Sequence, residues 1–266
     1  MIWFSRKAKS APNRSSRISA GAFRIALGLT AVAGNLIPFG TIAQPTLANE
    51  EIANASATEV AISPGSRQDP TWFGPVSSEQ LDQLSAEIIA ETNVLRADPA
   101  AYAQRLIALR PHYEGNLIKV PGQPMIQVFE GVSALDEAIA VLQNTPALPP
   151  LSTSAGMTLG AADHSTDLGS KGTTGHYGSD GSDPFTRMNR YGRWQATAGE
   201  NISYGAPTLA EWHVIQLLVD DGVANRGHRE VLLSDDYGAT GAACEAHAAY
   251  RIVCVMTYAG AYQEGR

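Results

Sequence analysis

Apolar residues recur every three or four positions over much of the chain after residue 77, which predicts a series of helices. Ser77 and Gln80 form a capping box, and Leu81, Leu84, Ile88 and Leu95 then share one helical face. Asp98-Pro99 supplies an N-cap and a proline at the first helical position, so a second helix is expected there. Further helices are expected to begin at Ser133, to span residues 152–169, and to follow Asp183-Pro184 and Pro207.

The pattern changes towards the C-terminus. Residues 237–244 and 251–259 are rich in Val, Ile, Tyr, Cys and Thr, which is typical of strands. Residues 111–131 contain three prolines and three glycines and predict an irregular segment. Because helices precede strands instead of alternating with them, we expect an α+β fold.

The first 48 residues have the composition of a secretory signal peptide. They contain six basic residues and no acidic one, and an apolar stretch runs from Ala22 to about Ala43. Thr46-Leu47-Ala48 is the first candidate cleavage site, and Thr41-Ile42-Ala43 is the other. We therefore expect residues 1–48 to be removed and the protein to be secreted, to the extracellular space or a periplasm.

The alternative for this segment is a retained membrane anchor. Gly34, Pro38 and Gly40 interrupt it, which leaves fewer than the ~20 apolar residues that a spanning helix prefers. No other part of the sequence is apolar enough to span a bilayer. Residues 49–76, rich in Ala, Ser, Pro and Gly, predict a flexible linker, and residues 77–266 are expected to form one domain.

Charge excludes one class of partner. The full chain has 19 basic and 26 acidic residues, a net charge of −7, and removal of residues 1–48 leaves 13 basic residues and a net charge of −13. A surface with this charge repels nucleic acids and anionic lipids, so we exclude a nucleic-acid-binding role.

Cys244 and Cys254 are the two cysteines of the chain. In an exported protein an even number of cysteines favours a disulfide, which here would join the two sides of the expected hairpin. Two buried free thiols are the alternative.

The candidate chemistry lies in three phrases that place a histidine or a glutamate beside glycines. His176 stands in Gly-His-Tyr-Gly-Ser-Asp-Gly, Glu200 in Gly-Glu-Asn-Ile, and His228 in Arg-Gly-His-Arg. Glycine lets the backbone approach its neighbours closely, so these side chains are expected around a shared cleft. Two imidazoles and a carboxylate are a usual set for a divalent metal such as zinc, or for acid–base chemistry.

In their order and spacing these phrases resemble the CAP superfamily of cysteine-rich secretory proteins, antigen 5 and pathogenesis-related 1 proteins, whose domain is also called SCP. The resemblance spans roughly Leu84 to Ala261 and includes Glu91-Thr92-Asn93-x-x-Arg96. It implies an α-β-α sandwich in which a three-stranded antiparallel sheet lies between helical layers. Residues of about 111–150 resemble an insertion in some bacterial members.

The resemblance also implies that His176, Glu200 and His228 line a central cleft and are the candidate metal ligands. The alternative is that these three residues form a hydrogen-bonded polar cluster that holds loops together. His164, in contrast, lies on the apolar face of its helix and is expected to be a satisfied core histidine.

The third member of the family's cleft tetrad of His, Glu, Glu and His, a glutamate shortly after a tryptophan, has no direct counterpart. Trp212 is followed by His-Val-Ile-Gln, and Asp220 or Asp221 are the candidate substitutes. Both aspartates stand at a predicted helix C-terminus, where the helix dipole disfavours a carboxylate. A structural salt bridge to Arg226 or Arg229 is therefore the competing expectation.

Three functions follow from these observations. The first is a secreted protein that binds an extracellular ligand, which by resemblance would be a sterol-like lipid, a divalent metal or another small molecule. The second is a metal-assisted hydrolase of peptide or cell-wall material, in which Glu200 activates water. The third is a non-catalytic interaction scaffold for a protein partner. The missing second glutamate of the tetrad weighs against catalysis, so an enzyme is not the favoured expectation.

Overall fold

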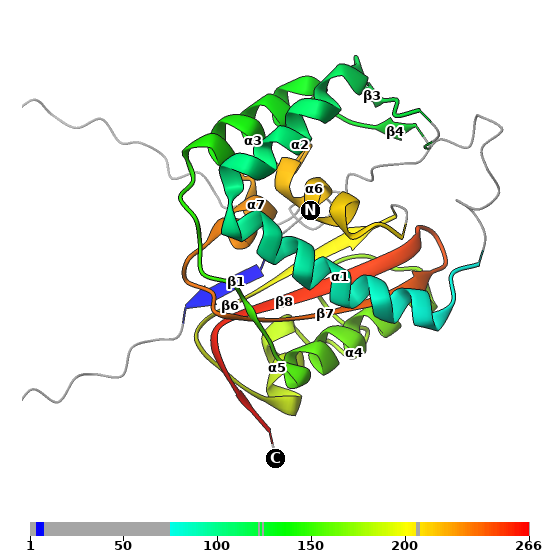
Figure 1. Ribbon diagram of the computed structural model, residues 1–266. Coiled ribbons are helices and arrows are strands. Elements are labelled where there is room, and N and C mark those ends of the chain that lie inside the picture. The colour runs from blue at the N-terminus through cyan, green and yellow to red at the C-terminus, as the bar shows by residue number, and fades with distance from the viewer. Residues whose placement is uncertain (1–3, 8–74, 122, 124, 206–207, 266) are drawn as a thin grey trace, which may run out of the picture. The chain divides into compact units, whose positions relative to one another are not determined.

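A computed structural model describes residues 4–7, 75–121, 123, 125–205 and 208–265 (Figure 1). Most of the predicted signal peptide and linker, including both candidate cleavage sites, lies outside the described residues. Within the described part of the chain, none of the helices combines the length and apolarity that crossing a membrane requires.

The centre of the domain is an antiparallel sheet of three long strands, β6 (Gly192–Tyr204), β8 (Arg251–Glu264) and β7 (Ala239–His247). Two short strands extend it, so that the order is β1-β6-β8-β7-β5. β1 (Phe4–Lys7) pairs antiparallel with β6, and β5 (Ser152–Thr153) pairs parallel with β7. The expected three-stranded antiparallel sheet is thus confirmed, with one short strand added at each edge.

Helices cover both faces of this sheet. α4 (Ala155–Lys171) and α5 (Pro184–Tyr191) pack on one face. α1 (Ser78–Ala97), α6 (Ala210–Val219) and α7 (Gly227–Leu233) lie on the other (Figure 1). This arrangement confirms the α+β class and the expected sandwich of a sheet between helical layers.

The segment predicted as an insertion forms a small satellite structure beside α1 and α6. α2 (Pro99–Leu109) packs against α3 (Val132–Asn144), and their apolar faces join the core below α1. Between the two helices lie the 3-10 turn η2 (Arg110–His112) and a three-stranded antiparallel sheet of β2 (Tyr113–Glu114), β3 (Leu117–Ile118) and β4 (Ile126–Gln127).

Three of the six predicted helix starts are confirmed by their caps, and the helix expected from residue 152 begins at Ala155, after β5. The Ser77–Gln80 capping box is present, and the Asp98 and Asp183 side chains accept hydrogen bonds from Ala101 N and Thr186 N. The predicted cap at Ser133 is wrong. α3 begins at Val132, and the Ser133 hydroxyl instead donates to the carbonyl of Glu130. The Pro207 helix start lies outside the described residues, and α6 begins at Ala210.

The residue pattern did not predict β6. The strand contains the polar sequence Gly-Glu-Asn, its pairing with β8 shifts between Gln195 and Ala198, and Ala196 has a φ of 65°. A bulge of this kind breaks the two-residue alternation by which strands are recognised. The Gly-Glu-Asn-Ile phrase is therefore part of the central sheet and not a loop at its end.

After the bulge, alternation along β6 sorts the polar side chains onto two faces. Ala198 and Ile202 pack with residues of α4 and α5, and Glu200 points to the same face because it lies two residues from each. Ser203 bonds to His213 in α6, so the odd-numbered side chains point to the opposite face. This sorting decides where the site residues lie.

Two glycines let α4 lie close to β7. A Cβ at Gly169 would stand 2.3 Å from the Ala246 carbonyl oxygen, and a Cβ at Gly241 would stand 2.3 Å from Thr158 N. Both distances are below any real van der Waals contact, so a larger residue would push the helix away from the sheet. Close packing of α4 in turn fixes the loop that follows it and carries His176.

The polar residues of the Glu91–Arg96 segment tie α1 to distant loops. The Arg96 guanidinium is fully buried and donates to the carbonyl oxygens of Pro149, Leu232, Ser234 and Tyr237. Asn93 exchanges two hydrogen bonds with the backbone of Leu151. These bonds satisfy carbonyl groups in loops and, at Leu232, in the last turn of α7, where the helix supplies no N–H partner.

The structure confirms the predicted disulfide. Cys244 and Cys254 are directly opposed on β7 and β8, and their sulfur atoms are bonded. Both cysteines are buried beneath α1. The bridge therefore closes the hairpin at the core side of the sheet.

Removal of this bridge should have a moderate effect. We expect the Cys244→Ala/Cys254→Ala double variant to lose about 2–3 kcal/mol in the free energy of unfolding, because the closed loop is short. Urea unfolding with and without reductant measures it. Reductant should destabilise the wild type by a similar amount and leave the double variant unchanged. Equal stability of the oxidised wild type and the variant would contradict this prediction.

Candidate functional site

His176 and Glu200 form one hydrogen-bonded pair, and an arginine completes it. His176 Nδ1 donates to Glu200 Oε1 at 2.8 Å, and Arg187 Nη2 donates to Glu200 Oε2 at 2.8 Å. The same guanidinium donates to the carbonyl oxygens of His176 and Ser182. Glu200 comes from β6, Arg187 from α5 and His176 from the loop after α4. Three elements are thus joined through one carboxylate.

The cluster of His176, Glu200 and Arg187 is buried. Glu200 is 0% exposed, Arg187 1% and His176 6%. Burial by itself would raise the pKa of the Glu200 carboxyl, but the hydrogen bond from His176 and the charge of Arg187 outweigh burial and hold that pKa below its ordinary value of 4.5. Glu200 is therefore a carboxylate whose charge is compensated inside the protein.

His164 lies beside this cluster and interacts with it electrostatically. Its Nε2 donates at 2.8 Å to the carbonyl oxygen of Gly175, the residue that precedes His176. Its Nδ1 is buried and makes no hydrogen bond. Burial lowers the pKa of His164, so the ring is held neutral. His164 is fully buried, as expected of a core histidine, but it supports the loop that carries His176.

The two shifted pKa values predict that stability falls on acidification. Below 6.5, the ordinary pKa of histidine, the unfolded chain takes up a proton at His164 that the folded protein resists, so stability falls with pH. The contribution of Glu200 is complete above its ordinary pKa of 4.5 and is lost as the pH falls through its lower folded-state pKa.

The first of these steps has a direct test. We expect the melting temperature to fall less between about pH 7.5 and about pH 5.5 in His164→Gln than in the wild type, because glutamine keeps the bond to Gly175 without titrating. His112→Gln, at a half-buried position in η2, is the control and should follow the wild type. The same pH dependence in all three proteins would refute the role of His164.

His228 forms a second pair, with Asp220. Its Nδ1 donates to Asp220 Oδ1 at 2.6 Å, and its backbone N donates to Asp220 Oδ2 at 2.9 Å. The backbone N of Arg229 also donates to Oδ2. The other ring nitrogen, Nε2, is buried without a hydrogen-bond partner. Both Asp220 and His228 are buried.

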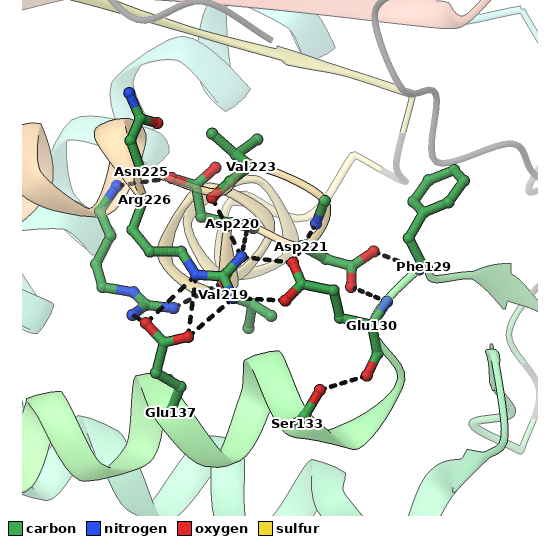
Figure 2. Close-up of polar contacts among 12 residues, drawn as sticks. Phe129, Glu130, Ser133, Glu137, Val219, Asp220, Asp221, Val223, Asn225 and Arg226 are labelled. Carbon is green, nitrogen blue, oxygen red and sulfur yellow. Dashed lines mark hydrogen bonds and ion pairs between the residues drawn. The ribbon is translucent and has the colours of Figure 1, made fainter.

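The competing expectation for the two aspartates, a salt bridge to Arg226 or Arg229, is wrong. Asp220 pairs with His228, and Asp221 accepts hydrogen bonds from the backbone N of Phe129 and Glu130 (Figure 2). Asp220 adopts a left-handed conformation with φ 55° as it ends α6, which turns its side chain towards the start of α7. Spacing along the chain could not distinguish the two aspartates.

The arginines pair instead with acids of the inserted segment. Arg226 forms ion pairs with Glu130 and Glu137, and Arg229 forms one with Glu137. Arg226 Nη1 also donates to the carbonyl oxygens of Asp220 and Val223. Figure 2 shows Arg226 between Glu130, Glu137 and the loop after α6. The insertion therefore braces the turn that presents Asp220 to His228.

The sheet separates the two histidine pairs. Glu200 bonds to His176 on the α5 face of β6, whereas the next residue, Asn201, donates through Nδ2 to the His228 carbonyl on the α7 face. Adjacent residues of a strand point to opposite faces. The structure thus brings His176 to Glu200 and His228 to Asp220, but it does not gather all of them in one open cleft.

The residues present do not fit a metal centre made of His176, His228 and Glu200. Both oxygens of Glu200 and both of Asp220 are engaged by protein donors, and the Arg187 guanidinium already supplies the positive charge next to Glu200. Among the residues that the structure describes, no three or more His, Cys, Asp or Glu side chains are grouped to hold a metal ion. We therefore derive no chemistry through a metal.

A solvent-accessible hollow of about 380 Å³ lies next to the His176–Glu200 cluster. It is formed by α4, the loop after it and α5, and it shares His164, Ser182 and Arg187 with the surroundings of the cluster. Nine of its twelve lining residues are polar or charged. Asp163 and Asp180 on its rim both pair with Arg190. A hollow with this lining offers hydrogen-bond partners to a polar molecule.

Sequence reasoning missed Arg187, which forms a buried ion pair with Glu200. The residue falls on a short predicted helix and carries no glycine-flanked phrase. The signal that could have identified it is its spacing, three residues after Pro184, which brings an arginine back over the preceding loop on the first turn of a helix.

The family model for the cysteine-rich secretory protein family, CAP, matches residues 135–258, which include His176, Glu200 and His228. Among solved structures, an outer surface protein of Borrelia burgdorferi is 16% identical with a TM-score of 0.35, covering 44% of this chain and 80% of that one. An extracellular SCP-domain protein of Bacillus anthracis is 20% identical with a TM-score of 0.33, covering 42% of this chain and 34% of that one, about a third of its length. No curated protein matches the sequence.

Proposed function

We propose that this chain, which belongs to the CAP superfamily through its residues 135–258, is an exported protein that binds a small polar extracellular molecule and catalyses no reaction. The observation that carries this proposal is that the buried carboxylates Glu200 and Asp220 are already paired with protein donors. Glu200 is bonded on both oxygens by His176 and Arg187 and is 0% exposed, so a substrate or an attacking water molecule from solvent does not reach it.

The hollow beside the cluster supports a polar ligand. Its volume of about 380 Å³ lies near the lower end of the range for small-molecule sites. A sterol-like lipid would bury a large apolar surface against a lining that offers Leu159 and Ala162 as its apolar side chains. Such a lipid would displace water from the charged groups of the lining, which opposes its binding. A hydroxyl- or amine-bearing molecule can add hydrogen bonds to these groups, of which Asp163, Asp167 and Asp180 are also bonded within the protein.

The alternative, a metal-assisted hydrolase of peptide or cell-wall material, is less well supported. A general base has to reach its substrate, and His228 and Glu200 are both 0% exposed. The buried cluster is better suited to hold β6, α5 and the loop after α4 in fixed positions, which keeps the wall of the hollow rigid.

The binding proposal is tested with the exported form of the protein and glucosamine as the probe, because it carries both hydroxyl groups and an amine. We expect amide chemical-shift changes confined to α4, the loop that follows it and α5. Thr166→Trp, which fills the hollow, should remove these changes. Ser170→Trp, on the same helix but outside the hollow, is the matched control and should retain them. Shifts that persist in Thr166→Trp, or their absence in the wild type, would count against binding in this hollow.

Catalysis is tested separately by turnover. Exported wild-type protein is expected to release no product from labelled casein or labelled peptidoglycan. Turnover that disappears in Glu200→Gln, when that variant still folds, would establish the hydrolase and overturn the proposal.

A further inference from the structure

The sheet has an edge that the chain covers with its own N-terminal residues. β6 would be an outer strand of the sheet without β1, because the strand order places β1 alone beyond it. β1 pairs antiparallel with four residues of this edge, from Phe4 opposite Glu200 to Lys7 opposite Thr197. An outer strand presents unpaired N–H and C=O groups, which are a template for another extended segment.

The covered stretch lies between the two histidine pairs. It ends at Glu200, which bonds to His176 on one face of the sheet, and the next residue, Asn201, bonds to the His228 backbone on the other face. Thr197, Ala198 and Glu200 are all buried in the full chain. A strand added at this edge therefore runs beside the part of β6 that bonds to His176 and to the His228 backbone.

β1 belongs to residues 1–48, the segment predicted to be removed on export. Its removal uncovers the Thr197–Glu200 edge in the exported form, with the backbone groups of a strand ready to pair. β1 has the sequence Phe-Ser-Arg-Lys, and the exported chain has a net charge of −13, since it retains 13 basic against 26 acidic residues. A basic segment is attracted to a domain with this charge.

We propose that the Thr197–Glu200 edge of β6 is a docking site for an extended basic peptide segment of a partner protein, which adds to the sheet as an antiparallel strand. In the full chain, Phe4–Lys7 occupies this site and excludes the partner. The site is distinct from the hollow between α4 and α5, so either can fail without the other.

The test uses the full chain and a Phe4→Pro/Ser5→Pro variant. The backbone N–H groups of consecutive residues in a strand point to opposite sides, so two adjacent prolines remove one donor to β6 without changing the charge. We expect those amides of Thr197–Glu200 that point towards β1 to exchange with deuterium at least about tenfold faster in the variant, and those that point towards β8 to stay protected. Amides of β7 and β8 around the disulfide serve as the internal reference for an intact fold.

A synthetic peptide of residues 1–9 then supplies the strand in trans. It should bind the double-proline variant, restore slow exchange at Thr197–Glu200, and fail to bind the wild-type full chain. The same peptide with prolines at its fourth and fifth positions should not bind. Equal exchange of these amides in the two full chains overturns the proposal. Equal binding of the peptides with and without prolines also overturns it, because it shows only attraction between opposite charges.

Discussion

Arg187→Met should unfold at a much lower urea concentration than the wild type. The substitution leaves the carboxylate of Glu200 buried with one partner in place of two, and it removes the donors to the carbonyl groups of His176 and Ser182. Loss of one partner of a buried charge pair costs about 3–5 kcal/mol in the free energy of unfolding. Urea denaturation followed by circular dichroism measures this loss.

Two further variants identify its cause. Arg190→Met on the same helix removes ion pairs to Asp163 and Asp180 on the surface, where such a pair is worth about 1 kcal/mol or less. Glu200→Gln in the Arg187→Met background should recover part of the loss, because the amide needs no compensating charge. Equal destabilisation by Arg187→Met and Arg190→Met would refute the assignment of Arg187 as the partner of Glu200.

Asp220→Ala should have the second largest effect. It removes the acceptor of the His228 Nδ1–H and of two backbone N–H groups, and it places alanine at a φ of 55°, where L residues are strained. An unsatisfied buried donor costs about 1–3 kcal/mol. Because three donors lose their acceptor and water can partly replace it, we expect a total loss of about 3–4 kcal/mol in the free energy of unfolding.

The neighbouring aspartate is the matched control. Asp221→Ala removes two hydrogen bonds from the backbone N of Phe129 and Glu130 that are exposed to water. Its loss in the free energy of unfolding should therefore be about 1 kcal/mol. Asp220→Asn should lie between the two, because asparagine tolerates the left-handed backbone and still accepts one of the bonds. If Asp220→Ala were no more costly than Asp221→Ala, the pairing of Asp220 with His228 would contribute little to stability.

Local signals predicted much of the fold. The caps at Ser77, Asp98 and Asp183 lie where the sequence indicates, because each depends on a side chain and a backbone group three residues away. The disulfide followed from the export signal and an even number of cysteines. β6 escaped prediction because its bulge and its Gly-Glu-Asn phrase remove the alternation that marks a strand.

The pairing of the site residues depends on contacts that spacing does not encode. The glycine-flanked phrases identified His176, Glu200 and His228, but not that Glu200 bonds to His176 on one face of the sheet while its neighbour in β6 bonds to the His228 backbone on the other. Similarly, the choice of Asp220 over Asp221 as the partner of His228 depends on the left-handed turn at the end of α6. Arg226 bonds across to the inserted segment, about 90 residues away in the chain, which no local pattern reveals.

Calorimetric titration of Zn²⁺ into the exported protein tests most directly whether these pairs brace the fold or form a metal centre. We predict no binding at micromolar Zn²⁺, and the same result for a His176→Asn/His228→Asn variant, in which asparagine can still donate to Glu200 and Asp220. Micromolar binding by the wild type that the folded double variant lacks would contradict the account.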